Sequence, residues 1–342
     1  MKKLLTLVVA GLLGVGALPQ LVHAETMNYT IKAEIPENQI DKAKTYFDLR
    51  MTPAQEEVIN LTVSNTSNEE LKLKVEPNTA VTNQNGVVDY SQKGAKKDST
   101  LKYAFSDLIK GETDITLAPN ETKELPYTIK MPAEKFDGII LGGFYVSKVN
   151  SEKEEAASKN VQIKNHYSYV VGAKLSETDT VVKPNLKLND VKPALQNYRT
   201  GITANLQNTE ATMMSELKVT TSVTKKGSQE VLHKTEKESM SMAPNSNFDF
   251  PISWDNQPLK AGKYELTVVA NDKDQSWKFT KEFEIKGEES AKLNKEAVEV
   301  EKDSTWIYYL IAGLVAALIA LLLIIIVAKR KKGGNKDEEE KD

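Results

Sequence analysis

The 342-residue chain contains no cysteine and only three histidines. Without cysteine it can form no disulfide bond, no thiolate nucleophile and no cysteine-ligated metal site. His166 and His233 stand in strand-like contexts, without the HExxH spacing or the His, Asp and Glu clusters that hold metals, and we interpret both as surface residues. A Gly-x-Ser-x-Gly elbow and a glycine-rich phosphate loop are missing too. The sequence therefore predicts no enzyme active site, no metal site and no cofactor.

An excess of basic charge is also missing. The chain has 45 Lys and Arg residues against 48 Asp and Glu. Between its two terminal segments it carries about six more acidic than basic residues. A mildly acidic surface gives no electrostatic reason to bind nucleic acid, so we predict no nucleic-acid partner.

The first 24 residues have the pattern of a secretory signal peptide. Lys2 and Lys3 precede a short apolar run over residues 4–18, and Val22 and Ala24 stand at the −3 and −1 positions of a cleavage site. Glycines and a proline interrupt the run, which argues against a membrane span. We predict export, with cleavage after Ala24.

The C-terminal end has the pattern of a membrane anchor. Residues 306–328 carry no charge, and at about 1.5 Å per residue they reach roughly 34 Å as a helix, which is enough to cross a hydrocarbon core of about 30 Å. Aromatic rings at the outer edge suit the interface, and basic residues directly after the run mark the cytoplasmic side. The predicted topology is single-pass, with the N-terminal region outside. The anchor residues are Trp306, Tyr308, Tyr309, Lys329 and Arg330.

Between these ends, apolar residues alternate with polar ones over most of the chain. Ile59, Leu61 and Val63 form one such series, and residues 264–268 form another. Period-two alternation between turn-forming residues is typical of half-buried antiparallel strands. We predict an all-β ectodomain interrupted by a few short helices, with residues 103–110 as the best candidate.

An internal repeat divides the ectodomain in two. Residues 118–129 match residues 243–254 without a gap, and residues 63–66 resemble residues 206–209. Each copy contains a proline within a strand pattern, which we expect at a sheet edge or bulge because proline cannot donate to the ladder. The repeat predicts two tandem Ig-like β-sandwich domains.

The first copy carries extra residues between positions 75 and 118. Asn85-Gly86 within them is a strong tight-turn signal, so we expect a hairpin and a loop, serving either as a binding surface or as an edge decoration without a ligand. Residues 288–305 have the spacing of a short helix or form a solvated stalk. The predicted division is: signal peptide 1–24, first β-sandwich 25–172, linker 173–184, second β-sandwich 185–287, stalk 288–305, transmembrane helix 306–328 and cytoplasmic tail 329–342.

Several motifs in combination resemble the WxL-interacting protein family. In the first domain they are residues 35–39 (IPENQ), 46–49 (YFDL), 82–86 (TNQNG), 131–132 (MP) and 136–143 (FDGIILGG); in the second, residues 243–254 and 261–264. The resemblance covers nearly the whole chain. Residues 51–55 depart from the Pro-Gly-Gln turn that the family often has, which affects only the local turn type.

The resemblance implies a Gram-positive surface protein that assembles with WxL-domain surface proteins. It implies that the first domain binds peptidoglycan and that the second binds host extracellular proteins. The resemblance assigns no individual binding residue, so the candidates are residues of its motifs. They are Asn38, Gln39, Tyr46, Asp48, Asn83, Asn85, Gly86, Asp137 and Gly138.

Three functions follow as hypotheses. The leading one is a membrane-tethered binding and scaffold protein. An alternative is a cell-wall-active hydrolase that uses paired carboxylates, which would require two of them facing each other across a cleft. A third is an assembly chaperone that donates or accepts a strand at a sheet edge.

Overall fold

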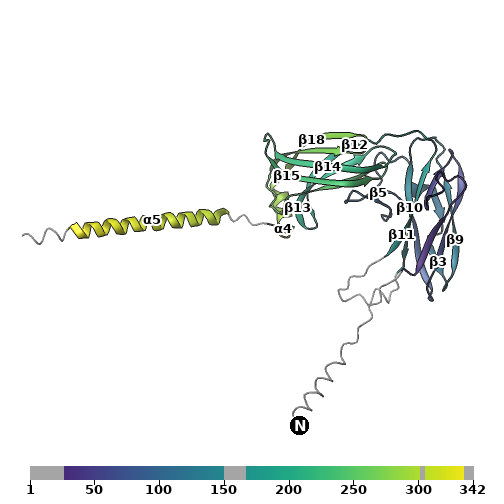
Figure 1. Cartoon of the computed structure of the whole chain (residues 1–342), viewed down its shortest axis with the longest axis horizontal. Helices are drawn as coiled ribbons and strands as arrows, with labels where there is room; N and C mark the ends of the chain where they lie inside the picture. The colour runs from purple at the N-terminus through teal and green to yellow at the C-terminus, as the bar shows by residue number, and fades with distance from the viewer. Residues whose placement is uncertain (1–26, 150–166, 301–304, 335–342) are drawn as a thin grey trace, which may run out of the picture. The chain divides into compact units, whose positions relative to one another are not determined.

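The computed structural model describes residues 27–149, 167–300 and 305–334 (Figure 1). The predicted signal peptide, His166 and the end of the predicted tail lie outside the described residues. The chain divides into two compact units, and each contains a β-sandwich. Unit 1 comprises Met1–Ala80, Tyr90–Lys97 and Lys102–Val182; unit 2 comprises Val81–Asp89, Asp98–Leu101 and Lys183–Asp342.

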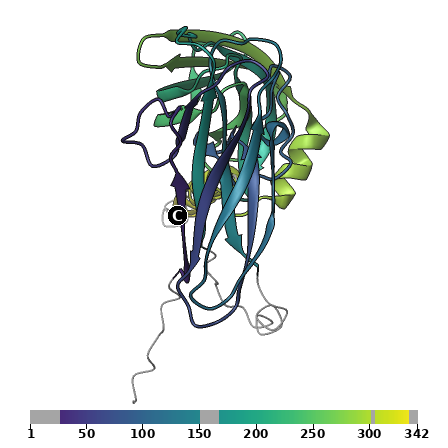
Figure 2. The ribbon, with the colours of Figure 1, turned by 90° about the vertical axis from the view of Figure 1, so that its right-hand side faces the viewer.

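Unit 1 consists of a sheet in the order β1-β3-β9-β7 and a sheet in the order β2-β11-β10-β4-β8. β1 pairs antiparallel with β3, whereas β2 pairs parallel with β11, so the N-terminal edge passes from one sheet to the other. Its long strands run side by side in the foreground of Figure 2. The short helix α2 (Phe105–Leu108) lies within the segment predicted as helical. The strands are β1 (Tyr29–Glu34), β2 (Phe47–Arg50), β3 (Glu56–Asn65), β4 (Leu71–Thr79), β7 (Ile109–Gly111), β8 (Asp114–Leu117), β9 (Thr122–Lys130), β10 (Ile140–Lys148) and β11 (Ser168–Ser176).

The core of unit 1 is centred on Phe144 of β10. Its ring centroid lies 4.8 Å from that of Tyr127, 5.8 Å from that of Phe105 and 6.1 Å from that of Phe47. Gly142 lets α2 approach β10, because a Cβ at this position would lie 2.1 Å from the Phe105 ring. The glycine pair of the FDGIILGG motif thus has a packing cause.

Unit 2 repeats the two-sheet arrangement, with the orders β12-β13-β16 and β15-β14-β17-β18. Trp254, Tyr264 and Phe283 pack in series in its core, with successive ring centroids 5.6 Å apart. These sheets confirm the all-β prediction of two Ig-like sandwiches. The strands are β12 (Leu186–Gln196), β13 (Arg199–Asn208), β14 (Met214–Lys225), β15 (Val231–Met242), β16 (Ser246–Ser253), β17 (Gly262–Asn271) and β18 (Ser276–Ile285).

His233 is buried, so its interpretation as a surface residue was wrong. Its side chain is 4% exposed. The imidazole lies over Trp254 at a centroid distance of 4.1 Å, and its Nδ1 is 2.8 Å from an Asp255 carboxylate oxygen. An aromatic face and a hydrogen-bond partner together offset the cost of burying a polar ring.

Pro251 lies at a sheet edge, as predicted, whereas Pro126 lies in an inner strand, beyond the part of that strand that β7 covers. Pro251 is in β16, the last strand of its sheet. Pro126 is in β9 and lies one residue beyond the last pair with β7, Gly111 and Tyr127. A missing N–H therefore interrupts no ladder in either copy.

The repeat also places one buried asparagine at the same position in each sandwich. Asn65 donates to the carbonyl oxygens of Glu69 (2.7 Å) and Ala118 (2.9 Å). Asn208 donates to those of Thr212 (2.7 Å) and Ala243 (3.0 Å). In each unit the side chain joins the end of one strand to the Ala-Pro-Asn turn before another.

The extra segment of the first copy forms a hairpin, as predicted. β5 (Val81–Thr82) pairs with β6 (Val88–Asp89), and the Asn83 N–H donates to Val87 O at 3.0 Å. Gly86 has a φ of +68°, and a Cβ there would lie 2.6 Å from Met240 Sδ. Only glycine fits this turn.

This hairpin is part of unit 2 and not of the sandwich that precedes it in sequence. The Thr82 hydroxyl lies 2.6 Å from Ser246 Oγ and accepts from the Ala243 N–H at 3.0 Å, both in buried positions. The Ser241 N–H donates to Gly86 O at 2.8 Å. We call residues 81–89 and 98–101, the two parts of this segment that belong to unit 2, the excursion.

Asp98 provides the second attachment of the excursion. Its carboxylate accepts from Gln207 Nε2 at 2.8 Å, from Asn247 Nδ2 and from the Thr100 N–H at 2.8 Å. Burial acts to raise the pKa of Asp98, but the hydrogen bonds from Thr100, Asn247 and Gln207 together outweigh it, and the pKa lies below its usual value.

At the opposite end of the same sandwich, helix α4 (Gly287–Glu296) is docked. Asn294 exchanges two hydrogen bonds with the backbone of Leu259, at 2.8 and 2.9 Å, and Ser290 Oγ donates to Leu259 O at 3.1 Å. The residues after the helix continue the contact, since the Val298 N–H donates to Tyr198 O at 2.7 Å. The predicted stalk therefore begins as a helix, which is visible in yellow-green in Figure 2.

We call this end of unit 2 the anchor end. Its tip is the turn between β12 and β13, where Asn197 (φ 49°) and Tyr198 (φ 62°) both have left-handed backbones. Such turns favour Asn-Gly, because glycine has no Cβ to strain. The Tyr198 side chain is nevertheless large and 70% exposed.

One helix among the described residues is long and apolar enough to cross a membrane. α5 (Thr305–Gly334) contains an apolar stretch, Ile307–Val327. All the predicted anchor residues lie within α5, and Tyr308 and Tyr309 are exposed near its start.

Replacing Asn65 or Asn208 by alanine should destabilise the corresponding sandwich. Each change removes two hydrogen bonds that a buried side chain donates to backbone carbonyl groups, at a total cost of about 1–3 kcal/mol. Thermal melting of the full chain should show a transition lowered by at least about 5 °C. The exposed Asn68→Ala variant is the control, and equal melting of Asn65→Ala and Asn68→Ala would contradict this role.

Asp98 should make the stability of unit 2 depend on pH. Because its folded-state pKa is lowered, ionised Asp98 stabilises the fold above the usual aspartate pKa of about 4, and this contribution is lost as the pH falls through the lowered value. At pH 7, Asp98→Asn should lower the unfolding free energy by about 1–3 kcal/mol. Denaturant titrations should show that this difference shrinks toward pH 2; a constant difference would refute the assignment.

Candidate functional site

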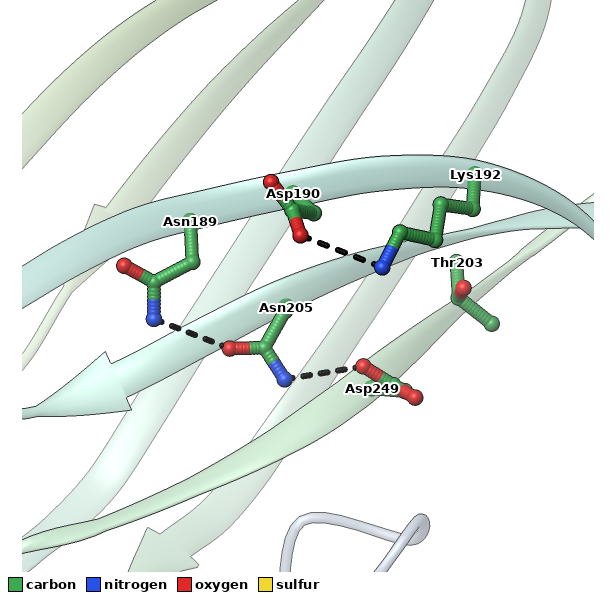
Figure 3. Close-up of a pocket in the computed structure, with 6 residues that line it drawn as sticks. All are labelled: Asn189, Asp190, Lys192, Thr203, Asn205 and Asp249. Atoms are coloured by element: carbon green, nitrogen blue, oxygen red, sulfur yellow. Dashed lines mark hydrogen bonds and ion pairs between the residues drawn. The ribbon is translucent and has the colours of Figure 1, made fainter. Parts of the chain in front are cut away.

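The outer face of the sheet β12-β13-β16 carries a row of polar side chains around a shallow hollow of about 510 Å³. Asn189 Nδ2 donates to Asn205 Oδ1 at 3.0 Å, and Asn205 Nδ2 donates to Asp249 Oδ1 at 2.8 Å. Figure 3 shows these side chains projecting from neighbouring strands. We call this set the polar face. Its lining residues are Asn189, Asp190, Lys192, Thr203, Asn205 and Asp249.

A bulge in β12 shapes the polar face. The register of β12 against β13 shifts by one residue between Leu188 and Val191, so that Asn189 and Asp190 together stand opposite Asn205. Lys281 of β18 donates to the Asn189 carbonyl oxygen and so satisfies a backbone group that the bulge removes from the ladder. The bulge thereby positions an amide and a carboxylate at the rim of the hollow.

The row continues to the excursion. Asn189 Nδ2 also donates to Gln207 Oε1 at 3.0 Å, and Gln207 in turn donates to Asp98. The amides therefore form one connected series from the hollow to the excursion. A connected series of side-chain amides fixes the orientation of every donor and acceptor that faces outward.

The carboxylates of the polar face are each held by a neighbour. Asp190 is 3.1 Å from Lys192 Nζ, and this hydrogen bond and ion pair lower the pKa of Asp190. Asp249 accepts from Asn205. A general acid would need a raised pKa, and the pKa of Asp190 is lowered. The polar groups of this face are therefore better suited to hydrogen-bonding a ligand than to acid catalysis. Among the described residues, no group of three or more His, Asp and Glu could hold a metal ion.

A second polar cluster lies in unit 1, where β2 and β11 end. Arg50 pairs in register with Ser176, and its guanidinium contacts the Asp179 carboxylate. Asn38 Nδ2 donates to Arg50 O at 3.2 Å and to Glu57 Oε2 at 2.6 Å. We call Asn38, Arg50, Glu57, Glu177 and Asp179 the strand-end cluster.

The strand-end cluster contains buried polar atoms with unused hydrogen-bonding capacity. Asn38 Oδ1, Arg50 Nη1 and Glu177 Oε1 are buried without a hydrogen-bond partner. The other carboxylate oxygen of Glu177 accepts from the Phe136 N–H at 3.1 Å. A buried polar atom without a partner costs about 1–3 kcal/mol, and such atoms are uncommon. Two acceptors and one cationic donor of this cluster thus have no protein partner.

The structure brings some of the sequence-predicted residues together. Gln39 donates to Tyr46 O at 2.8 Å and accepts from the Asp48 N–H at 2.9 Å. The Asp48 carboxylate faces Lys174 Nζ at 2.8 Å and is 7% exposed. Asn38 joins this group to the strand-end cluster. Gln39 and Asp48 therefore support the loop that presents Asn38.

Asp137 and Gly138 lie beside the strand-end cluster, and the remaining predicted residues lie in the excursion. Asp137 accepts from the Thr178 hydroxyl at 2.5 Å, and this hydrogen bond lowers the pKa of Asp137; Gly138 follows it with a φ of 90°. Asn83 and Asn85 are in the excursion, where Asn83 Oδ1 accepts from the Asn85 N–H at 2.9 Å. Asn83 thus stabilises its own turn, in unit 2.

Sequence reasoning missed the residues of the polar face, together with Arg50 and Glu177. Asn189, Asn205 and Asp249 occupy outward positions of alternating strands, where polar residues are ordinary. The one signal was a polar pair, Asn189-Asp190, that breaks the alternation of β12.

Two family models match the chain. The WxL Interacting Protein, peptidoglycan binding domain, matches residues 29–148, and the WxL Interacting Protein, host binding domain, matches residues 158–295. Together they cover most of the chain and both sandwiches. The chain belongs to the WxL Interacting Protein family. The resemblance in the motifs is thereby confirmed.

The boundaries of the family domains differ from those of the compact units. β11 lies within the host-binding match, but it pairs with β10 and β2 in unit 1. Residues 81–89 and 98–101 lie within the peptidoglycan-binding match, but they belong to unit 2. Each compact unit therefore contains residues from both family domains.

Several solved structures are similar at low sequence identity. The CsuC-CsuE chaperone-tip adhesion subunit pre-assembly complex of Acinetobacter baumannii has 10% identity, covering 66% of this chain and 90% of that chain, with a TM-score of 0.31. The Salmonella enterica SafA pilin in complex with the SafB chaperone has 12% identity (75% and 98% covered, TM-score 0.28). The E. coli chaperone DraB has 14% identity (75% and 98%, TM-score 0.28). At these scores the likeness carries no argument about function. No match was found among curated protein sequences.

Proposed function

We propose that this chain is a membrane-anchored binding and scaffold protein, which holds WxL-domain surface proteins close to the peptidoglycan layer. The observation that carries the proposal is the match of two binding-domain families over both sandwiches, followed by an apolar helix. The proposed topology is single-pass, with the sandwiches outside and the tail in the cytoplasm. The host-binding match supports host extracellular proteins as further partners.

We assign peptidoglycan binding to the strand-end cluster of unit 1. Stem peptides of peptidoglycan carry both carboxylate and amine groups. The Arg50 guanidinium suits a carboxylate, and the oxygens of Glu177 and Asn38 suit an ammonium group. The excursion is not assigned to wall binding, because it belongs to unit 2.

We assign protein partners to the polar face of unit 2. Outward amide and carboxylate groups around a shallow hollow suit a polar protein surface or an extended backbone. A binding role also agrees with the paired state of Asp190 and the hydrogen-bonded state of Asp249.

Arg50→Ala should weaken binding to purified peptidoglycan at least tenfold. The change removes a charged hydrogen-bond donor, which contributes about 1.5–3 kcal/mol. The measurement is a sedimentation assay with the full chain in detergent. Arg199→Ala is the matched control, because Arg199 is also paired with a carboxylate, at 2.6 Å from Glu299, but lies in unit 2. Equal peptidoglycan binding by the two variants would show that the strand-end cluster is not the wall-binding site.

The full chain should bind muropeptides without altering them. Its polar face offers carboxylates with neighbouring donors, and a glycosidase needs an acid and a base about 5–10 Å apart across a bound sugar. Mass spectrometry after incubation should detect no new products. A product that forms with turnover and disappears in Asp190→Asn or Asp249→Asn would establish the hydrolase instead.

A further inference from the structure

The anchor end of unit 2 has a feature that packing does not explain. Tyr198 has a left-handed backbone (φ 62°) at the tip of the β12–β13 turn, where glycine is the favoured residue. Its ring is 70% exposed, so no core contact offsets the backbone strain. A bulky residue that breaks a local rule without a packing gain is expected where a surface has a partner.

The chain length places this turn near the start of α5. The Val298 N–H is bonded to Tyr198 O at 2.7 Å, and α5 begins at Thr305. Seven residues reach at most about 25 Å even when fully extended. Arg199 is also held to Glu299, at 2.6 Å, so two contacts fix the start of this short connection.

The same connection is too short to bring the other end of the sandwich to the start of α5. β18 runs from the turn that contains Asp274 to Ile285, which leads directly into α4. Its ten residues span about 33 Å. With α5 in a bilayer, the anchor end is therefore the end of the sandwich that lies nearest the lipid surface.

We propose that the anchor end of unit 2 rests on the outer surface of the bilayer, with the Tyr198 ring in the headgroup layer. The proposal rests on the membrane anchoring proposed above. Tyrosine is enriched at this depth because its ring is apolar and its hydroxyl is polar. Val298, 49% exposed and bonded to Tyr198, adds apolar surface beside the ring. Tyr198 would then act with Tyr308 and Tyr309 as an interfacial aromatic contributed by the soluble domain.

The absence of cysteine permits a direct test with single-cysteine variants of the full chain. A bimane fluorophore is attached at Lys260→Cys (anchor end), Asp274→Cys (opposite end) or Leu310→Cys (within α5). All three side chains are exposed. The protein is reconstituted into phosphatidylcholine and phosphatidylglycerol vesicles, with or without a nitroxide on the lipid headgroup, and quenching is compared.

We expect at least threefold stronger quenching at position 260 than at position 274. Adding Tyr198→Gly, which fits the left-handed turn, should reduce the quenching at position 260 to near that at position 274, while the melting temperature in detergent is kept or raised. Equal quenching at 260 and 274, with strong quenching at 310, would overturn the proposal and leave the anchor intact. Quenching at 260 that Tyr198→Gly does not change would overturn the role of the ring. No quenching at 310 would overturn the membrane anchoring and this proposal together.

Discussion

A buried asparagine amide holds the turn before one strand to the end of another in both sandwiches, through Asn65 in the first and Asn208 in the second. In each case the acceptor is the carbonyl group of the alanine in an Ala-Pro-Asn turn, Ala118 or Ala243. The alanine N–H needs a partner as well, and here the two copies differ. In the first, Glu121 accepts it at 2.6 Å from within the turn. In the second, the shorter Ser246 stands at the equivalent position, and Thr82 of the excursion accepts the Ala243 N–H.

That single difference gives the excursion its place in unit 2. Ser246 cannot close the turn as Glu121 does, but its hydroxyl lies 2.6 Å from Thr82 and donates to Ala243 O at 2.8 Å. The excursion therefore completes a hydrogen-bonding arrangement that the first sandwich completes locally. The carboxylate of Asp98 then connects it to the amide series of the polar face. A boundary drawn by sequence similarity divides this arrangement, because the two parts are far apart in the chain.

Local patterns predicted the elements, and long-range contacts determined the rest. The alternation of residues such as Ile59 and Leu61, the repeat, the edge proline and the Asn85-Gly86 turn gave the sandwiches and the hairpin, since these features depend on neighbours along the chain. The burial of His233 could not be predicted, because it depends on Trp254 and Asp255, which lie directly after another strand, β16. Of the candidate residues, Asn38, Gln39, Tyr46 and Asp48 do lie together, and Asp137 lies beside the same cluster through Thr178. Arg50 and Glu177 are brought together only by the parallel pairing of β2 with β11. The alternation of apolar residues along a strand does not reveal which strand pairs with it.

The docking of α4 has a mechanical consequence. If α5 anchors the chain in a membrane, as proposed, a pull on the outer side of the protein is carried through the connection at Val298. The first elements in its path are two surface contacts, Val298 with Tyr198 and Arg199 with Glu299, and then the three hydrogen bonds that α4 makes to the backbone of Leu259. Their release would free about fifteen residues, or roughly 50 Å of extended chain, before β18 bears any load. Undocking of the helix thus lets the chain lengthen under tension while every strand of the sandwich stays in place.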